Sequence, residues 1–309
     1  MPARCPPVLI LAFNRPDLTR RALAAVQAAR PAAVYFAVDG ARAGKAGEHE
    51  AVQAVQELAQ TLDGCAVHTL FREQNLGCKL AVSQAISWFF EQVEEGIVME
   101  DDCVAHPSFF HFAAELLERY RDDERVMMIS GDNFQKGPPR TPYSYYFSRY
   151  THIWGWASWR RAWRLYDHAM SAWPELRDGD WLMDVLGDRD AVTYWTRIFD
   201  QTHGERNTSW GYRWMFAAFR NSGLTVLPNV NLVSNIGFGA EGTHNRATDD
   251  PHAALSLQEL PFPLRHPPFV IRDGRADALT QGTMFANPSL LRSAARRARG
   301  LLRRILHGQ

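Results

Sequence analysis

The stretch GIVMEDDCVAHPSFFHF, residues 96–112, carries the clearest signal for the fold. Its first part is a short apolar run typical of a buried strand, and Asp101 and Asp102 close it. Pro107 then suits the first turn of a helix that we expect to reach about Tyr120. A buried strand that ends in carboxylates and leads into a helix is the unit from which α/β sheets are built.

The same alternation of strand and helix runs through the first 130 residues. We predict further strands at residues 8–13, 34–38, 65–71 and 125–130, and helices around residues 18–29, 52–62 and 79–92. Such strands pair in parallel through right-handed crossovers. The predicted fold class is therefore α/β, a mostly parallel sheet with helices on both faces.

Polar residues follow three of these strands, and they are Asn14-Arg15, Asp39 and Glu100-Asp101-Asp102. The carboxyl ends of parallel strands are the edge at which α/β proteins bind ligands. We therefore expect these side chains to face one ligand.

After about residue 135 the pattern changes. Nine of the ten tryptophans fall between Trp154 and Trp214, and two strands, 224–228 and 231–237, are expected with a tight turn between them. Residues with helical spacing predict one face of a helix, in the core or lining a sugar pocket, and they are Trp156, Trp159, Trp163 and Tyr166. We divide the chain into residues 1–135, residues 136–287 (a second, α+β half of the same domain) and residues 288–309.

The charge is balanced overall, with 34 Lys and Arg against 34 Asp and Glu, but not along the chain. Six arginines and no acid lie in residues 288–309, so the rest carries a net charge of −6. A chain without a basic excess is a poor candidate for nonspecific nucleic-acid binding. Apolar residues opposite the arginines predict an amphipathic C-terminal helix, either on an anionic membrane surface or packed on the domain.

The four cysteines, Cys5, Cys65, Cys78 and Cys103, are scattered, with no CxxC pair and no histidine at zinc-finger spacing. This predicts free thiols in a reducing compartment. The N-terminal apolar run is shorter than a signal-peptide core or a membrane span. We expect a cytoplasmic protein, which binds the inner face of the membrane if the terminal helix faces lipid.

At a sheet edge the three adjacent carboxylates of Glu100, Asp101 and Asp102 would repel one another, and a bound divalent cation would offset this repulsion. An all-oxygen donor set suits Mg²⁺ or Mn²⁺ held together with substrate phosphates. The alternative is a solvated acidic turn that caps the following helix. Asp39-Gly40 is likewise either a ligand-binding carboxylate or an ordinary turn, and Arg15 either a phosphate ligand or a surface residue.

GFGAEG, residues 237–242, matches the pattern GxGxxG but not its context, because no helix signal follows it. Its glycines fit a flexible loop near a ligand. His244, just beyond, is either a metal or phosphate ligand or a structural residue. The sequence has no Gly-x-Ser-x-Gly elbow, P-loop or HExxH, so serine hydrolases, NTPases and zinc proteases lack support.

Taken in order, five segments resemble the nucleotide-sugar half of glycosyltransferases with the GT-A fold: PVLILAFNRP, AVDG, REQNLGCKLAVSQAI, GIVMEDDCVAHPSFFHF and VMMISGDN. The chain is similar to bacterial family 2-like enzymes and to the eukaryotic N-acetylglucosaminyltransferase I group. In that group an acidic triplet before a Pro-Xaa-Phe-Phe helix start forms the metal site, which Glu100 to Phe110 matches. The match continues through WGWASWRRAW, TSWGYRW and LPNVNLVSNIGFGAEGTHN.

The resemblance implies a metal-dependent, inverting glycosyltransferase of the hexosyltransferase class. Its donor would be a nucleotide-diphosphate sugar and its acceptor a hydroxyl of a cell-surface glycan or of a lipid-linked precursor. Residues 1–135 would bind the nucleotide sugar, and residues 136–287 the acceptor. By this resemblance, Asp102 and His244 would bind the metal or the diphosphate. Glu100 and Asp101 would contact the ribose and the sugar. Asn14, Arg15 and Asp39 would bind the nucleotide, with Asn75 and Lys79 near its phosphates.

The resemblance breaks off at the catalytic base. The eukaryotic relatives carry paired acids between the two tryptophans of TSWGYRW, where this chain has Gly211-Tyr212-Arg213. Glu205, just upstream, and Asp132, after the fifth predicted strand, are the candidate bases. A non-catalytic nucleotide-sugar or glycan-binding protein is one alternative. A sugar nucleotidyltransferase is another, although NRPDLTRR replaces the Gly-rich loop expected after its first strand.

Overall fold

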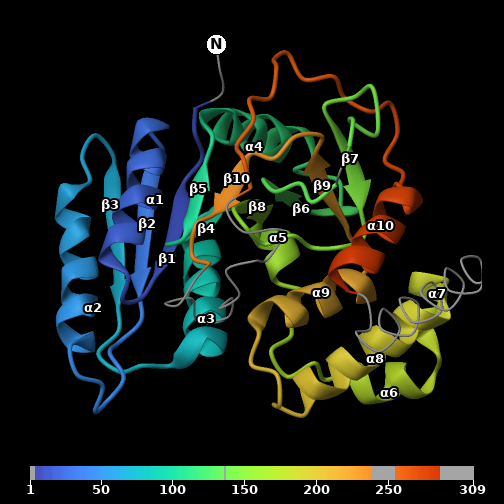
Figure 1. Cartoon of the computed structure of the whole chain (residues 1–309), viewed down its shortest axis with the longest axis horizontal. Helices are drawn as coiled ribbons and strands as arrows, with labels where there is room; N and C mark the ends of the chain where they lie inside the picture. The colour runs from blue at the N-terminus through green and yellow to red at the C-terminus, as the bar shows by residue number, and fades with distance from the viewer. Residues whose placement is uncertain (1–3, 136, 239–254, 286–309) are drawn as a thin grey trace, which may run out of the picture.

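An eight-stranded sheet forms the centre of the computed structural model, which describes residues 4–135, 137–238 and 255–285 (Figure 1). A second sheet has two strands. The strands are β1 (Val8–Ala12), β2 (Ala33–Val38), β3 (Ala66–Phe71), β4 (Glu95–Glu100), β5 (Cys103–Ala105), β6 (Val126–Ser130), β7 (Tyr145–Ser148), β8 (Trp156–Trp159), β9 (Leu224–Pro228) and β10 (Val233–Asn235).

The strand order in the large sheet is β3-β2-β1-β4-β8-β6-β9-β7. β2 pairs in parallel with β1 and β3, β1 with β4, and β6 with β9, whereas β8 runs antiparallel to both β4 and β6. β7 is antiparallel to β9. The predicted α/β class, with a mostly parallel sheet and helices, is therefore confirmed. Residues on both sides of position 135 contribute strands to this sheet.

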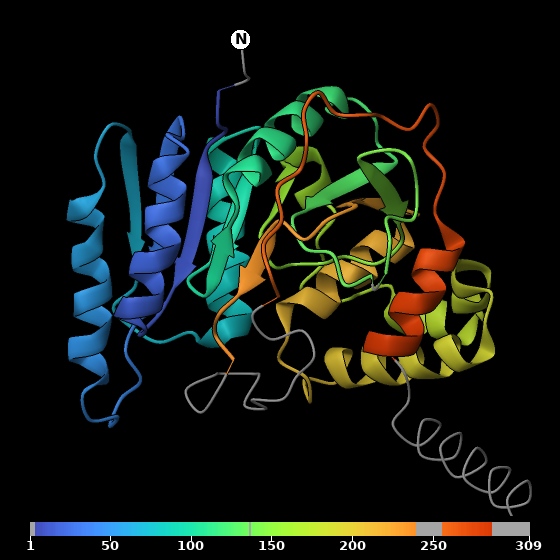
Figure 2. The same ribbon diagram turned by 45° about the horizontal axis from the view of Figure 1, so that its top comes forward.

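Helices cover both faces of the large sheet (Figures 1 and 2). α1, α2 and α4 share one apolar core with the sheet, and α3, α5 and α9 share the other. The helices are α1 (Pro16–Ala28), α2 (Glu48–Glu57), α3 (Gly77–Gln92), α4 (Pro107–Arg119), α5 (Arg160–Trp163), α6 (Trp173–Asp178), α7 (Trp181–Leu186), α8 (Arg189–His203), α9 (Trp210–Arg220) and α10 (Gly274–Met284), with a 3₁₀ turn, η1, at Leu58–Thr61.

The central strand β1 explains why the predicted strands read as continuous apolar runs. Val8 and Ile10 belong to one core, and Leu9 and Leu11 to the other, so successive side chains are buried on opposite faces. α4 begins at Pro107, as predicted, and the His106 side chain accepts a hydrogen bond from the Ser108 amide at 3.2 Å. Proline lacks the N–H that a first helical turn would leave unpaired.

The predicted helical face from Trp156 to Tyr166 is wrong in its first part. Trp156 and Trp159 belong to the strand β8, and the helix α5 begins after them, at Arg160. The two tryptophans lie in opposite cores of the large sheet, as residues an odd number apart on a strand must. Pairing with β4 and β6 on both sides decides this segment, and local spacing does not reveal it.

The predicted pair of strands at 224–228 and 231–237 also needs correction. β9 lies between β6 and β7 in the large sheet, so both of its edges are already paired. β10 instead pairs antiparallel with β5, and Asn235 lies opposite Cys103. The small sheet thereby brings residues 233–237 beside the acidic triplet.

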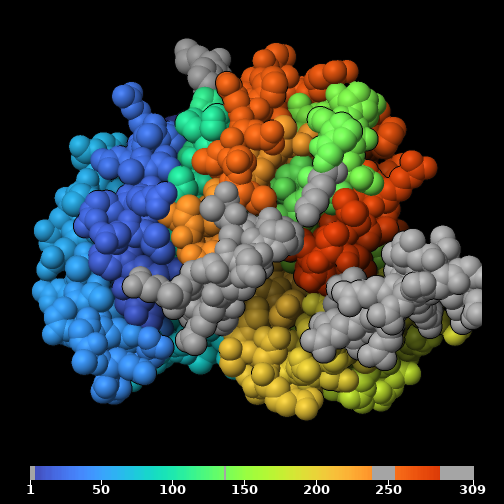
Figure 3. Space-filling model, in the orientation of Figure 1, coloured from blue at the N-terminus to red at the C-terminus, as the bar shows by residue number. Residues whose placement is uncertain are grey.

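A second helical group and a long strap complete the described chain. α6, α7 and α8 pack with α9 around Trp173, Trp195 and Phe199. Residues 255–273 run over the upper part of the molecule in Figure 3. The amides of Leu260 and Arg265 in this strap donate hydrogen bonds to the side-chain oxygens of Ser108 and Ser144, at 3.2 and 2.9 Å.

Three further expectations have different outcomes. All four cysteines are free thiols, as predicted. Among the described residues, no helix is both long and apolar enough to cross a bilayer. His244, most of the loop 237–242 and the predicted C-terminal helix, residues 288–309, lie outside the described residues.

Candidate active site

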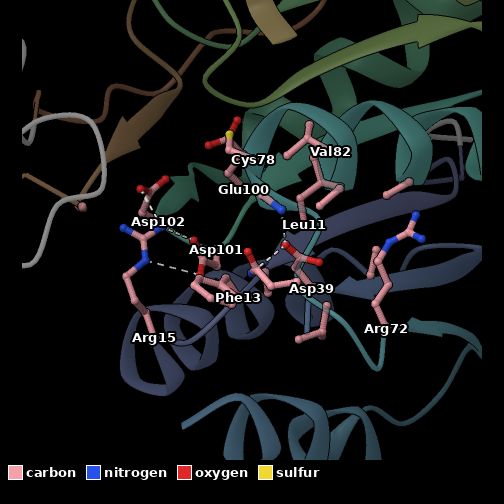
Figure 4. Close-up of a pocket in the computed structure, with 18 of the residues that line it drawn as sticks. Leu11, Phe13, Arg15, Asp39, Arg72, Cys78, Val82, Glu100, Asp101 and Asp102 are labelled. Carbon is pink, nitrogen blue, oxygen red and sulfur yellow. Dashed lines mark hydrogen bonds and ion pairs between the residues drawn. The ribbon is translucent and has the colours of Figure 1, made fainter. Parts of the chain in front are cut away.

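A cavity of about 400 Å³ opens at the carboxyl ends of β1, β2 and β4 (Figure 4). Its walls come from these strand ends, from the start of α3 and from later parts of the chain. Figure 4 shows Asp102 and Arg72 at opposite ends, with Asp39 between them. The apolar part of the lining includes Leu11, Phe13, Ala37, Val82 and Ala85. The location is the one that strand direction predicts for an α/β sheet.

The predicted site residues divide into two groups. Those that line the cavity are Arg15, Asp39, Asn75, Glu100, Asp101 and Asp102. The predicted residues outside its lining are Asn14, Lys79, Asp132 and Glu205. The strand-end rule therefore brings together the residues after β1, β2 and β4 but not Asp132 after β6.

Arg15 is the cation of the acidic end. Its Nε atom lies 3.4 Å from Oδ2 of Asp101, and its NH2 atom forms a closer ion pair with Oδ1. The same NH2 atom lies 2.9 Å from Oδ2 of Asp102. The Asp101 and Asp102 side chains are 4 % and 11 % exposed. Since one guanidinium contacts two of three clustered carboxylates, this end of the cavity carries excess negative charge when all are ionised.

Burial acts against that charge. Burial, together with the neighbouring carboxylates of Asp102 and Asp101, raises the pKa of Glu100 to about 8. Burial also raises the pKa of Asp101 to about 6, although Arg15 opposes the shift. Clustered carboxylates hold protons in this way until another positive charge arrives.

The small sheet fixes Asp102 from the other side. The Asn235 side chain donates a hydrogen bond from Nδ2 to Oδ1 of Asp102 at 3.2 Å, and the Ile236 amide donates to its carbonyl at 2.8 Å. A β-carbon on residue 237 would lie 2.2 Å from Oδ2 of Asp102. Glycine at this position is what lets the backbone approach the carboxylate so closely.

These residues fit a divalent cation that completes its coordination with ligand oxygens. In the part of the chain that the structure describes, no three His, Cys, Asp or Glu side chains form a closed metal cage. Mg²⁺ and Mn²⁺ held with phosphates need only one or two carboxylates from the protein. The Arg15 guanidinium already places positive charge at Asp102, and Gly237 leaves the carboxylate without a side chain above it.

The carboxylate of Asp39 is hydrogen-bonded to other groups of the protein. Its oxygens accept hydrogen bonds from the amides of Gly40, Leu76 and Gly77, each at 3.0 Å, and from Nδ2 of Asn75, also at 3.0 Å. The side chain thereby ties the end of β2 to the start of α3. Both Asp39 and Asn75 line the cavity, and the contacts between them shape its middle.

Asn14 belongs to a supporting network beside the cavity. Its Nδ2 atom donates to Oε1 of Glu48 at 3.0 Å, and Glu48 also accepts from the amide of Arg42 at 2.8 Å and from its Nε at 2.9 Å. These contacts lower the pKa of Glu48 to about 2, with the Arg42 side chain as the largest cause. Arg42 lines the cavity and lies 5.4 Å from the ring centroid of Phe13.

Lys79 and Glu205 lie together, outside the cavity lining. Lys79 Nζ forms an ion pair with Oε2 of Glu205, and Arg213 NH2 lies 2.9 Å from Oε1. These cations, Lys79 first, lower the pKa of Glu205. The Arg213 guanidinium is buried and also donates to the carbonyls of His168 and Thr202, so it holds the start of α9 in place.

Asp132 lies in a closed pair. Its side chain is fully buried, and Oδ1 lies 2.7 Å from Nδ1 of His152. The Trp154 amide donates to Oδ2 at 3.3 Å, and Trp154 itself lines the cavity. Nε2 of His152 is buried, and it has no hydrogen-bond partner among the described residues. The ring of Phe134 stacks on the imidazole with centroids 4.9 Å apart.

Several residues that line the cavity are not among the site residues predicted from the sequence: Arg72, Trp154, Ser209, Asn235 and Gly237. Arg72 follows β3, and its position after a predicted strand was the one usable signal. Gly237 belongs to the loop pattern GFGAEG, but this pattern does not reveal its contact with Asp102. The other three come from segments that reach the cavity through long-range pairing.

No protein-family model and no curated protein matches the sequence. Solved structures resemble it in part. The mannosyltransferase PcManGT from Pyrobaculum calidifontis, in complex with GDP-Man and Mn²⁺, has 15 % identity and a TM-score of 0.33 over 51 % of this chain and 45 % of its own. S. aureus TarS 1–349 has 11 % identity and a TM-score of 0.41 over 72 % of this chain and 58 % of its own.

HddC from Yersinia pseudotuberculosis has 11 % identity and a TM-score of 0.31 over 50 % of this chain and 77 % of its own. This chain therefore spans about half the length of the mannosyltransferase and of TarS. Because the TM-scores are all below 0.5, the activities of these proteins are not transferred to this chain.

Proposed function

We propose that the chain is a glycosyltransferase that uses a nucleotide-diphosphate sugar and a divalent cation, Mn²⁺ or Mg²⁺. The cavity at the strand ends carries this proposal, because its two ends differ in chemistry. One end holds the acidic triplet with Arg15, and Figure 4 shows Arg72 at the other end. The lining also includes Arg42 and apolar side chains such as Leu11 and Val82. A nucleotide sugar has the same polarity, with a planar base at one end and a diphosphate and sugar at the other.

The residues of the acidic end suit departure of a diphosphate. A cation at Asp102 would supply positive charge for the leaving group, with His244 as the second proposed ligand. The Arg15 guanidinium can donate to phosphate oxygens in a bidentate manner. Glu100 and Asp101 can accept hydrogen bonds from ribose and sugar hydroxyls. Asn14, Asp39 and Asn75 act through the cavity wall that they hold in place, and Lys79 lies outside the cavity lining, paired with Glu205.

Glu205 and Asp132 remain the proposed bases, and their surroundings rank them. Glu205 is paired with Lys79 and Arg213, and its lowered pKa makes it the weaker base. Asp132 orients His152, whose Nε2 atom is free of protein hydrogen bonds in the described chain. A proton accepted at Nε2 would be balanced by the Asp132 carboxylate, as in other acid–histidine pairs. A hydroxyl activated in this way would displace the diphosphate in one step, with inversion.

The proposed acceptor is a hydroxyl of a cell-surface glycan or of its lipid-linked precursor. Such precursors are presented at the inner face of the membrane, where a cytoplasmic enzyme would bind anionic lipid through residues 288–309. Co-sedimentation with anionic liposomes, with and without these residues, tests this part. Equal binding of both chains would remove the membrane contact and leave the enzymatic proposal intact.

A panel of nucleotide sugars with Mn²⁺ tests the activity itself. We expect hydrolysis or transfer by the wild type and a loss of about 10²- to 10³-fold in Asp102→Ala. Asp122→Ala is the matched control, because Asp122 is exposed and its side chain makes no hydrogen bond with any described residue. Equal rates in wild type and Asp102→Ala would contradict the cation at this carboxylate.

The same panel separates the alternatives. Saturable binding of a nucleotide sugar without turnover, across many acceptors, would favour a non-catalytic binding protein. Formation of a nucleotide sugar from a nucleoside triphosphate and a sugar 1-phosphate would identify a nucleotidyltransferase. That class requires the triphosphate as substrate, so the two assays give opposite results for the two enzyme classes.

A further inference from the structure

Arg15 stands where a cation at Asp102 would have to bind. Its NH2 atom lies 2.9 Å from Oδ2 of Asp102, and the guanidinium is also paired with Asp101. The Arg15 side chain is 16 % exposed, so little solvent screens these contacts. A divalent ion on the same oxygen would lie next to the guanidinium, and two positive groups at that distance repel strongly.

The other side of Asp102 offers no free approach. Oδ1 accepts the hydrogen bond from Asn235, and the backbone of Gly237 lies against Oδ2. Both oxygens therefore already have protein partners. A cation can reach Asp102 by displacing Arg15, since the alternative is to break the hydrogen bond from Asn235 at the end of β10.

Arg15 has a second ion-pair partner, and its side chain can turn towards a ligand in the cavity. Asp101 keeps an ion pair with the guanidinium when the contact to Asp102 is lost. Arg15 also lines the cavity, immediately before Pro16 at the start of α1. A diphosphate in the cavity would offer oxygens that match the guanidinium fork. Exchange of partners would then leave neither cation without an anion.

We infer that Arg15 occupies the cation position at Asp102 until a diphosphate binds, so that metal and diphosphate enter the cavity together. The inference rests on the proposed function, because it takes a cation and a diphosphate as the ligands. It predicts weak binding of the metal alone and stronger binding once the diphosphate has drawn Arg15 away. By linkage, the metal strengthens diphosphate binding by the same factor.

Binding of Mn²⁺ alone, followed by electron paramagnetic resonance without nucleotide, tests the exchange. We expect Arg15→Met to bind Mn²⁺ about 5- to 150-fold more tightly than the wild type. Arg20→Met is the matched control, because it removes the same charge from the first turns of α1, the helix that Arg15 precedes, and Arg20 pairs with the exposed Asp17. Its Mn²⁺ affinity should equal that of the wild type.

A calorimetric titration with pyrophosphate in the presence of a chelator tests the second half of the exchange. Arg15→Met should bind pyrophosphate more weakly than the wild type, and Arg20→Met should not. Unchanged pyrophosphate affinity in Arg15→Met would overturn the transfer of Arg15 to the phosphate. Circular dichroism checks the fold, and Arg15→Lys replaces Arg15→Met if the latter is unfolded, because a lysine cannot bridge both carboxylates as the fork does.

The outcomes separate this inference from the proposed function. Equal Mn²⁺ affinity in the wild type and Arg15→Met would overturn the exchange and leave the enzymatic proposal standing. Failure of both chains to bind Mn²⁺, with nucleotide sugar as well as without it, would remove the cation from the proposed function and this inference with it.

Discussion

The acidic triplet after β4 and Asp132 after β6 are two strand-end carboxylate sites on one sheet, and they differ in access to the cavity and in charge balance. The triplet lines the cavity and has more carboxylates than cations, and the raised pKa values of Glu100 and Asp101 favour their protonated forms. Asp132 is fully buried and closed off by His152 and the Trp154 amide. The triplet can accept a further positive charge, whereas the Asp132 carboxylate already has its partners within the protein.

β8 is the cause of this difference. It lies between β4 and β6 and runs antiparallel to both, so the residues that lead into it, 152–155, cross the carboxyl edge of the sheet. His152 and Trp154 thereby cover Asp132 and leave the end of β4 open. The comparison teaches that a carboxylate at a strand end faces the ligand directly only where the segment leading into the neighbouring reversed strand does not cover it.

The largest effect that would test the comparison is loss of stability in Asp132→Asn. We expect its free energy of unfolding to fall by about 3 kcal/mol, because a buried partner is removed from His152. Urea unfolding measures this, and Asp102→Asn is the comparison, since removing one of three clustered carboxylates should cost little stability or add some. A greater loss of stability in Asp102→Asn than in Asp132→Asn would reverse the contrast between the two sites.

Gly237→Ala probes the open site without touching a charge. The added β-carbon would meet Oδ2 of Asp102 at 2.2 Å, so the loop or the carboxylate must move. We expect affinity for Mn²⁺ with nucleotide sugar to fall about 10- to 100-fold, the range found when the support of a metal ligand is disturbed. Gly282→Ala, which meets nothing within 4 Å, should bind as the wild type does. Normal affinity in Gly237→Ala would contradict the close approach.

The pH dependence of Glu48→Gln tests the network that supports the open site. The pKa of Glu48 is lowered to about 2, so its ionised form stabilises the fold above its ordinary pKa of 4.5. At pH 7 we expect Glu48→Gln to cost about 1.5 kcal/mol of unfolding free energy. The difference from the wild type should shrink as the pH falls from about 4.5 towards 2. A pH-independent difference in urea unfolding would exclude the ion pair as its source.

The smallest expected effect is that of Lys79→Met. The ion pair with Glu205 is partly exposed, with the glutamate 54 % and the lysine 19 % exposed, so solvent screens it and its loss should cost about 0.2–1 kcal/mol of stability. Removing the lysine also relaxes the lowered pKa of Glu205. If Asp132 and His152 supply the base, the pH profile of transfer stays as in the wild type. A shift of the acidic limb to higher pH in Lys79→Met would favour Glu205 as the base instead.

Most of the large sheet could be predicted because buried parallel strands appear as apolar runs. β1, β2, β4 and β6 are such runs, and the polar residues that end three predicted strands all contribute to the cavity or its support. The prediction stopped where pairing is decided at long range. WASW in β8 carries no local strand signal that outweighs its helical spacing, and β10 joins β5 because both edges of β9 are already occupied.

The same limit applies to the site. Arg15, Asp39 and the triplet could be found because they follow strands in the sequence. Asn235 and Gly237 could not, because their contacts with Asp102 depend on the pairing of β5 with β10. His152 had no sequence signal at all, since its role comes from burial beside Asp132.

The pairing of β5 with β10 also has a consequence for how the protein folds. Asp102 and Asn235 are 133 residues apart in the sequence, and contacts between such distant segments are slow to form because a long loop must close first. The parallel strands β1 to β4 involve shorter loops and can form earlier. A chain synthesised only as far as β9 would therefore contain β1 to β4 but not the contact from Asn235 to Asp102, so that the site becomes complete only after β10 has been made.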